Sequence, residues 1–305
     1  MRIGIMLGAT PGPGSTLDGL IAFAKEVEEK GFPSLWLAHV FGLDAITALA
    51  LAGRETSRIE LGTAVVPTYP RHPTAMAQQA VTAGVAAGGR FTLGIGLSHQ
   101  LVIEAMMGLS YEKPASHMRE YLEVLAPLLR GEPASYQGER YRVSAGLQVE
   151  GAPAVPVLVA ALGPVMLGVT ARLAGGTITW MTGPKTLADY VVPTLREAAS
   201  KAGRPEPRVV AGFPVAVTDD VKKARERVGS ILKMYGTLPS YRAMLDREGA
   251  QGPADVALVG NEAQVGAAID QLSETGASDL MAAIVPVADD TVERTLAFLT
   301  SRSKR

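Results

Sequence analysis

The sequence predicts a single (β/α)8 barrel that spans residues 1–305 and carries two excursions. Short runs of β-branched or apolar residues alternate with longer segments whose apolar residues recur at helical spacing, which is typical of parallel β-α-β units. Eight such strands can be counted, each followed by helix, and no shift in composition marks a linker. With 305 residues, 47% of them hydrophobic, the chain is long enough for one large core.

The first half of the chain supplies four strand–helix pairs. The predicted strands are Ile3–Leu7, Ser34–Ala38, Arg58–Val66 and Arg90–Gly96. From Leu17 onward, apolar residues repeat at helical spacing until Gly31 ends that helix. The next helices begin near Asp44, which suits an N-cap, and near Pro73, which suits a first turn. The fourth is the amphipathic stretch Lys113–Gly131.

The second half opens with the first excursion and then resumes the alternation. Residues Ala134–Val143 are predicted to form a small hairpin around Gln137 and Gly138. The remaining predicted strands are Val155–Ala161, Gly176–Trp180, Arg208–Val217 and Asp279–Val285. The remaining helices begin at Pro164 or cover Lys185–Lys201, Val221–Tyr235, Glu262–Thr275 and Thr291–Ser301. The second excursion is an irregular segment from Tyr235 to Asp255 that has room for some helix.

Composition excludes several classes of function. The net charge is −1 with no basic stripe, so nucleic acid is not an expected partner. Cysteine is absent, and neither an HExxH motif nor a cluster of Asp, Glu and His stands at ligand spacing, so no metal site is expected. No GxSxG elbow supports a serine nucleophile. The apolar runs are too short to cross a bilayer and no signal region opens the chain, so a soluble protein suited to the cytoplasm is expected.

Two glycines at the end of the fourth strand, Gly94 and Gly96, precede Ser98 and His99. The segment "GIGLSH" approaches a dinucleotide fingerprint, but His99 takes the third glycine position and the expected acid falls on a helix. Two interpretations remain open. The glycines either serve only a tight turn, or they let a flat ligand approach the backbone while Ser98 and His99 supply polar contacts.

Two further strand ends carry candidate residues, because the active sites of such barrels lie where the strands end. In "ALGP", Gly163 precedes a helix that opens on Pro164, and free N–H groups at this corner suit a phosphate. His39 ends the second strand, where a purely structural histidine is unusual. His72 is interpreted as ordering a loop, and His117 as a surface or packing residue on its helix.

Taken together, the quoted segments resemble one family. "GIML", "SLWLAH", "RIELGTAVVP", "RHPTAMAQQA", "GGRFTLGIGLSH", "HMREYLEVLAPLLRG", "ALGPVMLGVTARLAGGTITW" and "GASDLMAAIVP" follow the order found in the bacterial luciferase-like monooxygenase superfamily. Within it, the chain resembles the oxidoreductases that use the deazaflavin coenzyme F-420. The resemblance covers nearly the whole chain, and "GRFTLGIG" and "ALGP" carry most of its weight.

The resemblance implies a set of coenzyme-binding residues around the strand ends. The ring would rest on a bulge of the third strand, at Thr63, Ala64 and Val65, with a non-prolyl cis peptide between Ala64 and Val65. The other implied contacts are His39, Gly96, Ser98 and His99 near the ring and Ala161, Gly163 and Pro164 beside the phosphate-bearing tail. Ala38 stands where the family usually has an acid before His39, so the partner that would fix this imidazole in one tautomer is missing.

The resemblance also implies an activity: hydride transfer between F-420 and a small, apolar organic substrate, with His39 or His99 moving the accompanying proton. The Tyr235–Asp255 segment is expected to cover the substrate, flanked by Trp180, Met181 and the loop from His99 to Gly108. Two alternatives remain: a monooxygenase that uses reduced FMN and oxygen, and a non-catalytic ligand-binding barrel. The family also leads us to expect a homodimer.

Overall fold

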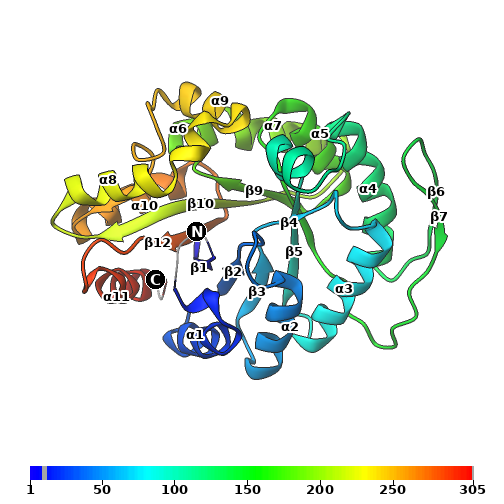
Figure 1. Ribbon diagram of the computed structural model, residues 1–305, viewed down its shortest axis with the longest axis horizontal. Helices are drawn as coiled ribbons and strands as arrows, with labels where there is room; N and C mark the ends of the chain where they lie inside the picture. Colours follow the sequence, from blue (N-terminus) through cyan, green and yellow to red (C-terminus); the bar gives the residue numbers. More distant parts are fainter. Residues whose placement is uncertain (9–11, 304–305) are drawn as a thin grey trace.

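The computed structural model describes residues 1–8 and 12–303, and it confirms the predicted barrel. Eight parallel strands form the wall (Figure 1), and the pairing of β9 with β10 and of β12 with β1 closes the sheet on itself. In spatial order the wall strands are β1 (Arg2–Leu7), β2 (Ser34–Leu37), β3 (Glu60–Thr63), β5 (Phe91–Gly96), β8 (Val157–Ala160), β9 (Gly176–Trp180), β10 (Arg208–Val217) and β12 (Asp279–Ile284). The carboxyl ends of all eight therefore surround one opening.

The helices that cover the wall begin close to where the sequence predicts them. Thr16 and Asp44 cap the first two helices by accepting hydrogen bonds from Gly19 N–H and Thr47 N–H. Gly31 ends the first helix in the left-handed conformation, with φ of 90°. The covering helices are α1 (Leu17–Lys30), α2 (Ala45–Glu55), α3 (Pro73–Ala86), α4 (Pro114–Leu129), α5 (Pro164–Leu173), α7 (Val192–Lys201), α10 (Glu262–Glu274) and α11 (Thr291–Ser303).

The third predicted strand is interrupted by a bulge. β3 ends at Thr63, and the short strand β4 (Val66–Pro67) then resumes pairing with β5. Gly62 pairs with Thr92 whereas Val66 pairs with Ile95, so the third strand carries one residue more than β5 over this stretch. Such an insertion bends a strand and re-aims its side chains.

The helix predicted over Lys185–Lys201 is divided into three parts. A short turn, α6 (Pro184–Thr186), is followed by the π-helical turn η3 (Leu187–Val191) and then by α7. Pro193 lies in the first turn of α7 and has no N–H to offer a preceding carbonyl. The regular hydrogen-bond spacing cannot continue through it, and the turn before it widens.

The helix predicted over Val221–Tyr235 is α8 (Val221–Ile231), which is followed by the 3-10 helix η4 (Lys233–Thr237). The second excursion contains more regular structure than the sequence indicates, because it includes the end of η4 and the helix α9 (Pro239–Glu248). Neither the short strand β11 (Leu258–Gly260), which extends the sheet beside the end of β10, nor the π-helical turn η2 (Leu101–Met106) follows from the sequence pattern. Both are too short to produce a periodic signal.

The first excursion is the predicted hairpin, formed by β6 (Ala134–Gln137) and β7 (Arg142–Ala145), which projects outside α4 in Figure 1. Glu120 of α4 holds its turn, because its buried carboxylate accepts N–H bonds from Arg140 at 2.8 Å and Tyr141 at 3.2 Å. Glu120 is therefore a structural residue.

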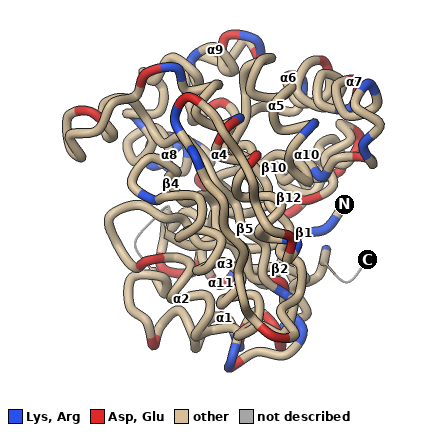
Figure 2. The backbone as a smooth tube through the Cα atoms, turned by 90° about the vertical axis from the view of Figure 1, so that its right-hand side faces the viewer, with Lys and Arg blue, Asp and Glu red and all other residues tan. Residues whose placement is uncertain are grey.

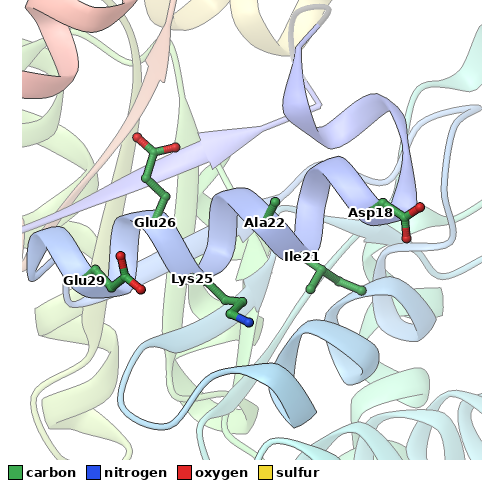
Figure 3. Close-up of a pocket in the computed structure, with 6 residues that line it drawn as sticks. All are labelled: Asp18, Ile21, Ala22, Lys25, Glu26 and Glu29. Carbon is green, nitrogen blue, oxygen red and sulfur yellow. The ribbon is translucent and has the colours of Figure 1, made fainter.

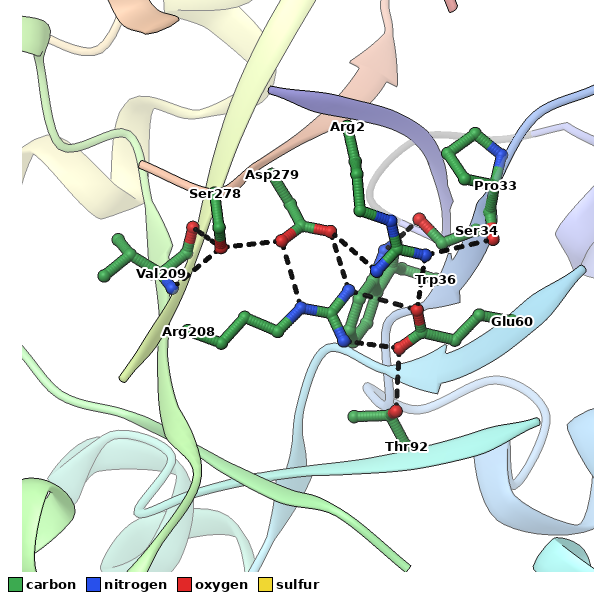
Figure 4. A network of polar contacts seen from close by, with 10 residues as sticks. All are labelled: Arg2, Pro33, Ser34, Trp36, Glu60, Thr92, Arg208, Val209, Ser278 and Asp279. Carbon is green, nitrogen blue, oxygen red and sulfur yellow. Dashed lines mark hydrogen bonds and ion pairs between the residues drawn. The ribbon is translucent and has the colours of Figure 1, made fainter. Parts of the chain in front are cut away.

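An ionic network closes the amino-terminal end of the barrel (Figure 4). Arg208 donates to both oxygens of Glu60 and to both oxygens of Asp279, at 2.6 to 3.1 Å. Its guanidinium also lies 5.4 Å from the centroid of the Trp36 ring. Burial alone would raise the pKa of Glu60, but the hydrogen bonds and charge of Arg208 lower it overall. Bidentate pairing on both sides is the geometry in which a buried arginine is well satisfied.

Charged residues of both signs are scattered over the surface (Figure 2), in keeping with a net charge of −1. Of the helices that the structure describes, none is long and apolar enough to cross a membrane.

Candidate active site

Small side chains form a floor at the opening of the barrel. Ala38, Ala64, Gly96 and Ala160 lie at the ends of four neighbouring strands, and the three alanines are only half-buried. A Cβ atom placed on Gly96 would lie 3.2 Å from the Ala160 Cβ, which shows how closely these strand ends pack. Trp180 ends the next strand, β9, and borders the floor. We call Ala38, Ala64, Gly96 and Ala160 the floor. The floor presents apolar atoms to solvent, because its three alanines are only half-buried.

The bulge of the third strand forms one part of the floor. Its peptide bond between Ala64 and Val65 is cis, as the resemblance implies. Thr63 fixes the bulge from below, because its hydroxyl donates to Gly94 O and accepts from Gly94 N–H, both at 2.8 Å. Thr63 is completely buried whereas Ala64 and Val65 are half-buried. Thr63 thus supports the surface that the next two residues present.

Gly94 and Gly96 make room for this bulge. A Cβ on Gly94 would lie 2.0 Å from the Thr63 carbonyl oxygen, and a Cβ on Gly96 would lie 2.7 Å from the Val65 Cγ2. Both glycines therefore allow the strand that carries the floor to bend. A ligand contact at Gly96, which belongs to the floor, stays a prediction.

Ser98 combines an uncommon backbone conformation with an unused hydroxyl. Its φ of 59° is left-handed, which few residues other than glycine adopt. Tyr111 OH donates to its carbonyl at 3.4 Å, but the half-buried hydroxyl has no hydrogen-bond partner within residues 1–8 and 12–303. Such conformations concentrate at functional sites, in agreement with a ligand contact at Ser98.

His39 is held by groups on two other segments. Its Nδ1 accepts the N–H of Ala45, in the first turn of α2, at 3.2 Å. Its Nε2 lies 3.5 Å from Nη2 of Arg71, and the same nitrogen donates to Asp44 Oδ2 at 2.6 Å. Burial lowers the pKa of His39 and the Arg71 charge lowers it further, against the opposing effect of Asp44. The ring is therefore neutral, and its single lone pair can accept from Ala45 N–H or from Arg71 but not from both. These donors from α2 and from the loop before α3 hold the ring in place of an acid at Ala38.

His99 occupies different surroundings. Its ring packs edge-on against Tyr235 and Tyr241, with centroids 5.9 and 5.8 Å away. Both ring nitrogens are without hydrogen bonds in the part of the chain that the structure describes. Burial lowers the pKa of His99, so the ring is neutral and keeps one free lone pair. His39 and His99 share no contact. Tyr235 and Tyr241, from the segment expected to cover the substrate, belong to the same hydrophobic cluster as Trp180 and Met181.

The α5 corner is open, as the "ALGP" motif predicts. Gly163 and Pro164 are exposed, while Ala161 is buried beneath them. No side chain caps α5, and a Cβ placed on Gly163 would meet nothing within 4 Å. Free N–H groups at the start of this helix could therefore reach an anion.

The two other histidines have structural roles. His117 is buried, stacks on Tyr69 with centroids 4.0 Å apart, and bonds to Thr68 at 2.9 Å, in agreement with packing. His72 caps α3 by accepting the N–H of Thr74 at 3.3 Å, which confirms that it orders its loop.

Two hollows in the structure are lined by none of the four floor residues. One, of about 420 Å³, is lined by residues of α1 alone, including Asp18, Lys25 and Glu29, and faces outward (Figure 3). The other, of about 10 Å³, lies between Trp180 and α8 and has room for no more than a water. Among the described residues no group of three or more His, Asp and Glu could hold a metal ion.

Comparison with known proteins decides the family. The luciferase-like monooxygenase family matches residues 1–294. The chain belongs to this family. It is accordingly an enzyme of the oxidoreductase class. A Mycobacterium tuberculosis protein named as a coenzyme F-420-dependent oxidoreductase is 28% identical over 96% of this luciferase-like chain and 87% of its own length.

Solved structures share the fold of this luciferase-like protein. The F-420-dependent tetrahydromethanopterin reductase of Methanopyrus kandleri superposes with a TM-score of 0.80 and 22% identity, covering 99% of this chain and 97% of that one. A Baeyer–Villiger monooxygenase of Pseudomonas putida, solved with FMN, gives a TM-score of 0.76 and 19% identity over 100% and 97% of the two chains.

Sequence reasoning missed four residues of this site. Arg71 stands beside His72 in a segment that follows the third strand, so the strand-end rule could have found it. Asp44 was recognised only as a helix cap. Tyr235 and Tyr241 lie in the irregular segment, where no local pattern marks them.

Proposed function

We propose that this enzyme transfers a hydride between coenzyme F-420 and a small, uncharged organic substrate. The observation that carries this proposal is the floor, an apolar surface formed by strand ends and by the bulge after Thr63. A relative that matches 96% of this chain is named as F-420-dependent. The floor fits a planar ring because its side chains are no larger than a methyl group. The uncapped α5 corner fits a phosphate of the coenzyme tail.

A bound deazaflavin supplies the hydride-accepting and hydride-donating carbon, and the protein supplies position and proton transfer. Two protein donors, Ala45 N–H and Arg71, face the single lone pair of neutral His39. His39 is therefore not the group that takes up a proton. His99 keeps a free lone pair on a neutral ring, so we assign the proton to His99.

The support for His39 weakens the alternative of a non-catalytic barrel. That alternative was motivated by Ala38 in place of an acid, and the contacts of His39 with Ala45 and Arg71 provide a replacement. The monooxygenase alternative keeps two supporting observations, the description of the family as luciferase-like monooxygenase and the FMN-bound enzyme of the same fold. Homodimerisation and a cytoplasmic location stay predictions.

Titration of the purified protein with F-420 and with FMN separates the two coenzymes. Trp180 borders the floor and is half-buried, so its emission should respond to a ring placed there, and Trp180→Phe serves as the control for the signal. We expect quenching that saturates at micromolar F-420 and none with FMN. Saturation by FMN alone would replace the proposal by the monooxygenase.

A further inference from the structure

Three polar rings meet beside the floor and leave their polar atoms unused. The ring of His99 packs against Tyr235 of η4 and Tyr241 of α9. The two tyrosine rings are nearly perpendicular to one another, with centroids 5.2 Å apart. Neither ring nitrogen of His99 and neither phenol oxygen makes a hydrogen bond within the described chain.

All three side chains are half-buried, but none of their nitrogen or oxygen atoms is enclosed, so these atoms reach solvent. Burial lowers the pKa of His99 and raises the pKa of both tyrosines, so all three rings stay uncharged at neutral pH. A ligand oxygen can therefore replace water at these atoms without breaking a hydrogen bond of the protein. The protein keeps three neutral hydrogen-bonding groups together without using any of them for its own fold.

The three rings are not paired with a charged side chain. No hydrogen bond or ion pair joins His99, Tyr235 or Tyr241 to an ionised side chain of the described residues. The directions in which their pKa values shift agree, because burial is the first cause for each ring. Their apolar neighbours include Trp180 and Met181. Without a nearby cation, a phosphate or carboxylate placed here would lose its hydration with no compensating partner.

We propose that His99, Tyr235 and Tyr241 form the polar end of the substrate site and bind the carbonyl or hydroxyl oxygen of an uncharged, apolar substrate. This rests on the proposed function and deepens it. A bound deazaflavin would accept the hydride released from the C–H bond in the oxidising direction and would return it in the reducing direction. A free nitrogen of His99 would accept the O–H proton in the first case and return it in the second. A tyrosine hydroxyl donates a hydrogen bond to the substrate oxygen throughout.

The test uses two probes with the same carbon skeleton, cyclohexanone and cyclohexanecarboxylate. Their binding to the full chain is measured by ligand-observed NMR, with and without F-420. We expect the ketone to bind at least about tenfold more tightly than the carboxylate. The double variant Tyr235→Phe/Tyr241→Phe should weaken ketone binding about tenfold, the loss of one to two hydrogen bonds.

The same double variant separates binding from folding. Because neither hydroxyl has a partner in the described chain, its melting temperature should match or exceed that of the parent protein. Tyr136→Phe, on the hairpin strand β6, is the matched control and should change neither quantity. A carboxylate that binds as tightly as the ketone overturns the proposal, as does undetectable ketone binding or ketone affinity that survives the loss of both hydroxyls.

The outcomes remain distinct from those of the coenzyme titration. If F-420 does not bind, the proposed function is wrong. The effect of the two tyrosine substitutions on ketone binding can be measured without coenzyme, so it tests the substrate site separately.

Discussion

The guanidinium of Arg71 lies 3.5 Å from the imidazole of His39, although the two residues follow different strands. Asp44 holds that guanidinium at 2.6 Å, and Ala45 N–H occupies the other nitrogen of the ring. Ala45 N–H and the Arg71 guanidinium are both donors, whereas the neutral His39 ring has one acceptor nitrogen. A protonated His39 ring would have no acceptor and would be repelled by the Arg71 charge. The pair keeps His39 uncharged.

Replacing Arg71 by glutamine should raise the pKa of His39 toward its ordinary value, because a positive charge that opposes protonation is removed. The pKa can be followed by NMR titration of the His39 ring in the protein without coenzyme. Arg227→Gln, an exposed arginine on α8, is the control and should leave it unchanged. A His39 pKa that stays or falls in Arg71→Gln would contradict this account.

Filling the floor should block the coenzyme while leaving the fold intact. Ala160→Leu adds three carbons to a half-buried position at the opening, and we expect F-420 affinity to fall by about tenfold or more. Ala267→Leu makes the same change at an exposed position on α10 and should have no effect. Fluorescence titration of both variants, with melting curves, is the measurement. Equal affinities would place the ring elsewhere.

Substitutions of two glycines should affect two different quantities, the stability of the fold at Gly94 and coenzyme affinity at Gly163. Gly94→Ala drives a methyl group against the Thr63 carbonyl oxygen, so we expect a loss of about 3 kcal/mol or more in unfolding free energy, or no folded protein. Gly163→Val meets no neighbour and has φ of −81°, so its stability should be normal. Its coenzyme affinity should fall, because the side chain shields the helix N–H groups. Urea unfolding and coenzyme titration test the two effects separately.

Buried His117 should make stability depend on pH in a defined window. Burial lowers its pKa to about 4, from an ordinary value of 6.5, so the unfolded chain binds a proton that the folded protein does not. The free energy of unfolding should therefore decrease as the pH falls from about 6.5 to about 4, by about 3 kcal/mol in all. His117→Gln should lack this part of the decrease. Urea unfolding at pH 7, 5.5 and 4.5 compares the two; parallel curves would refute the assignment.

The sequence predicts elements whose signals are local and repeated. Gly176–Trp180 and Arg208–Val217 are strands with the predicted bounds, and the capping role of Asp44 follows from one residue beside an apolar repeat. It does not predict the break after Thr63, because the hydroxyl that fixes the bulge bonds to Gly94, thirty-one residues away. The family resemblance, not the pattern, located the cis bond.

The candidate site divides in the same way. His39, Ser98 and His99 stand out because polar residues follow buried strands. Arg71 and the two tyrosines gain their meaning only from tertiary contacts with His39 and His99, which no spacing in the sequence encodes.

The ion pairs around Arg208 close the amino-terminal end of the barrel. The opening at the carboxyl ends of the strands is therefore where we expect both coenzyme and substrate to enter. A flat molecule resting on the strand ends lies beneath whatever the tyrosines hold. Under the proposed function, the reactant that lies deeper would have to bind first and leave last, so we expect an ordered sequence of binding and release.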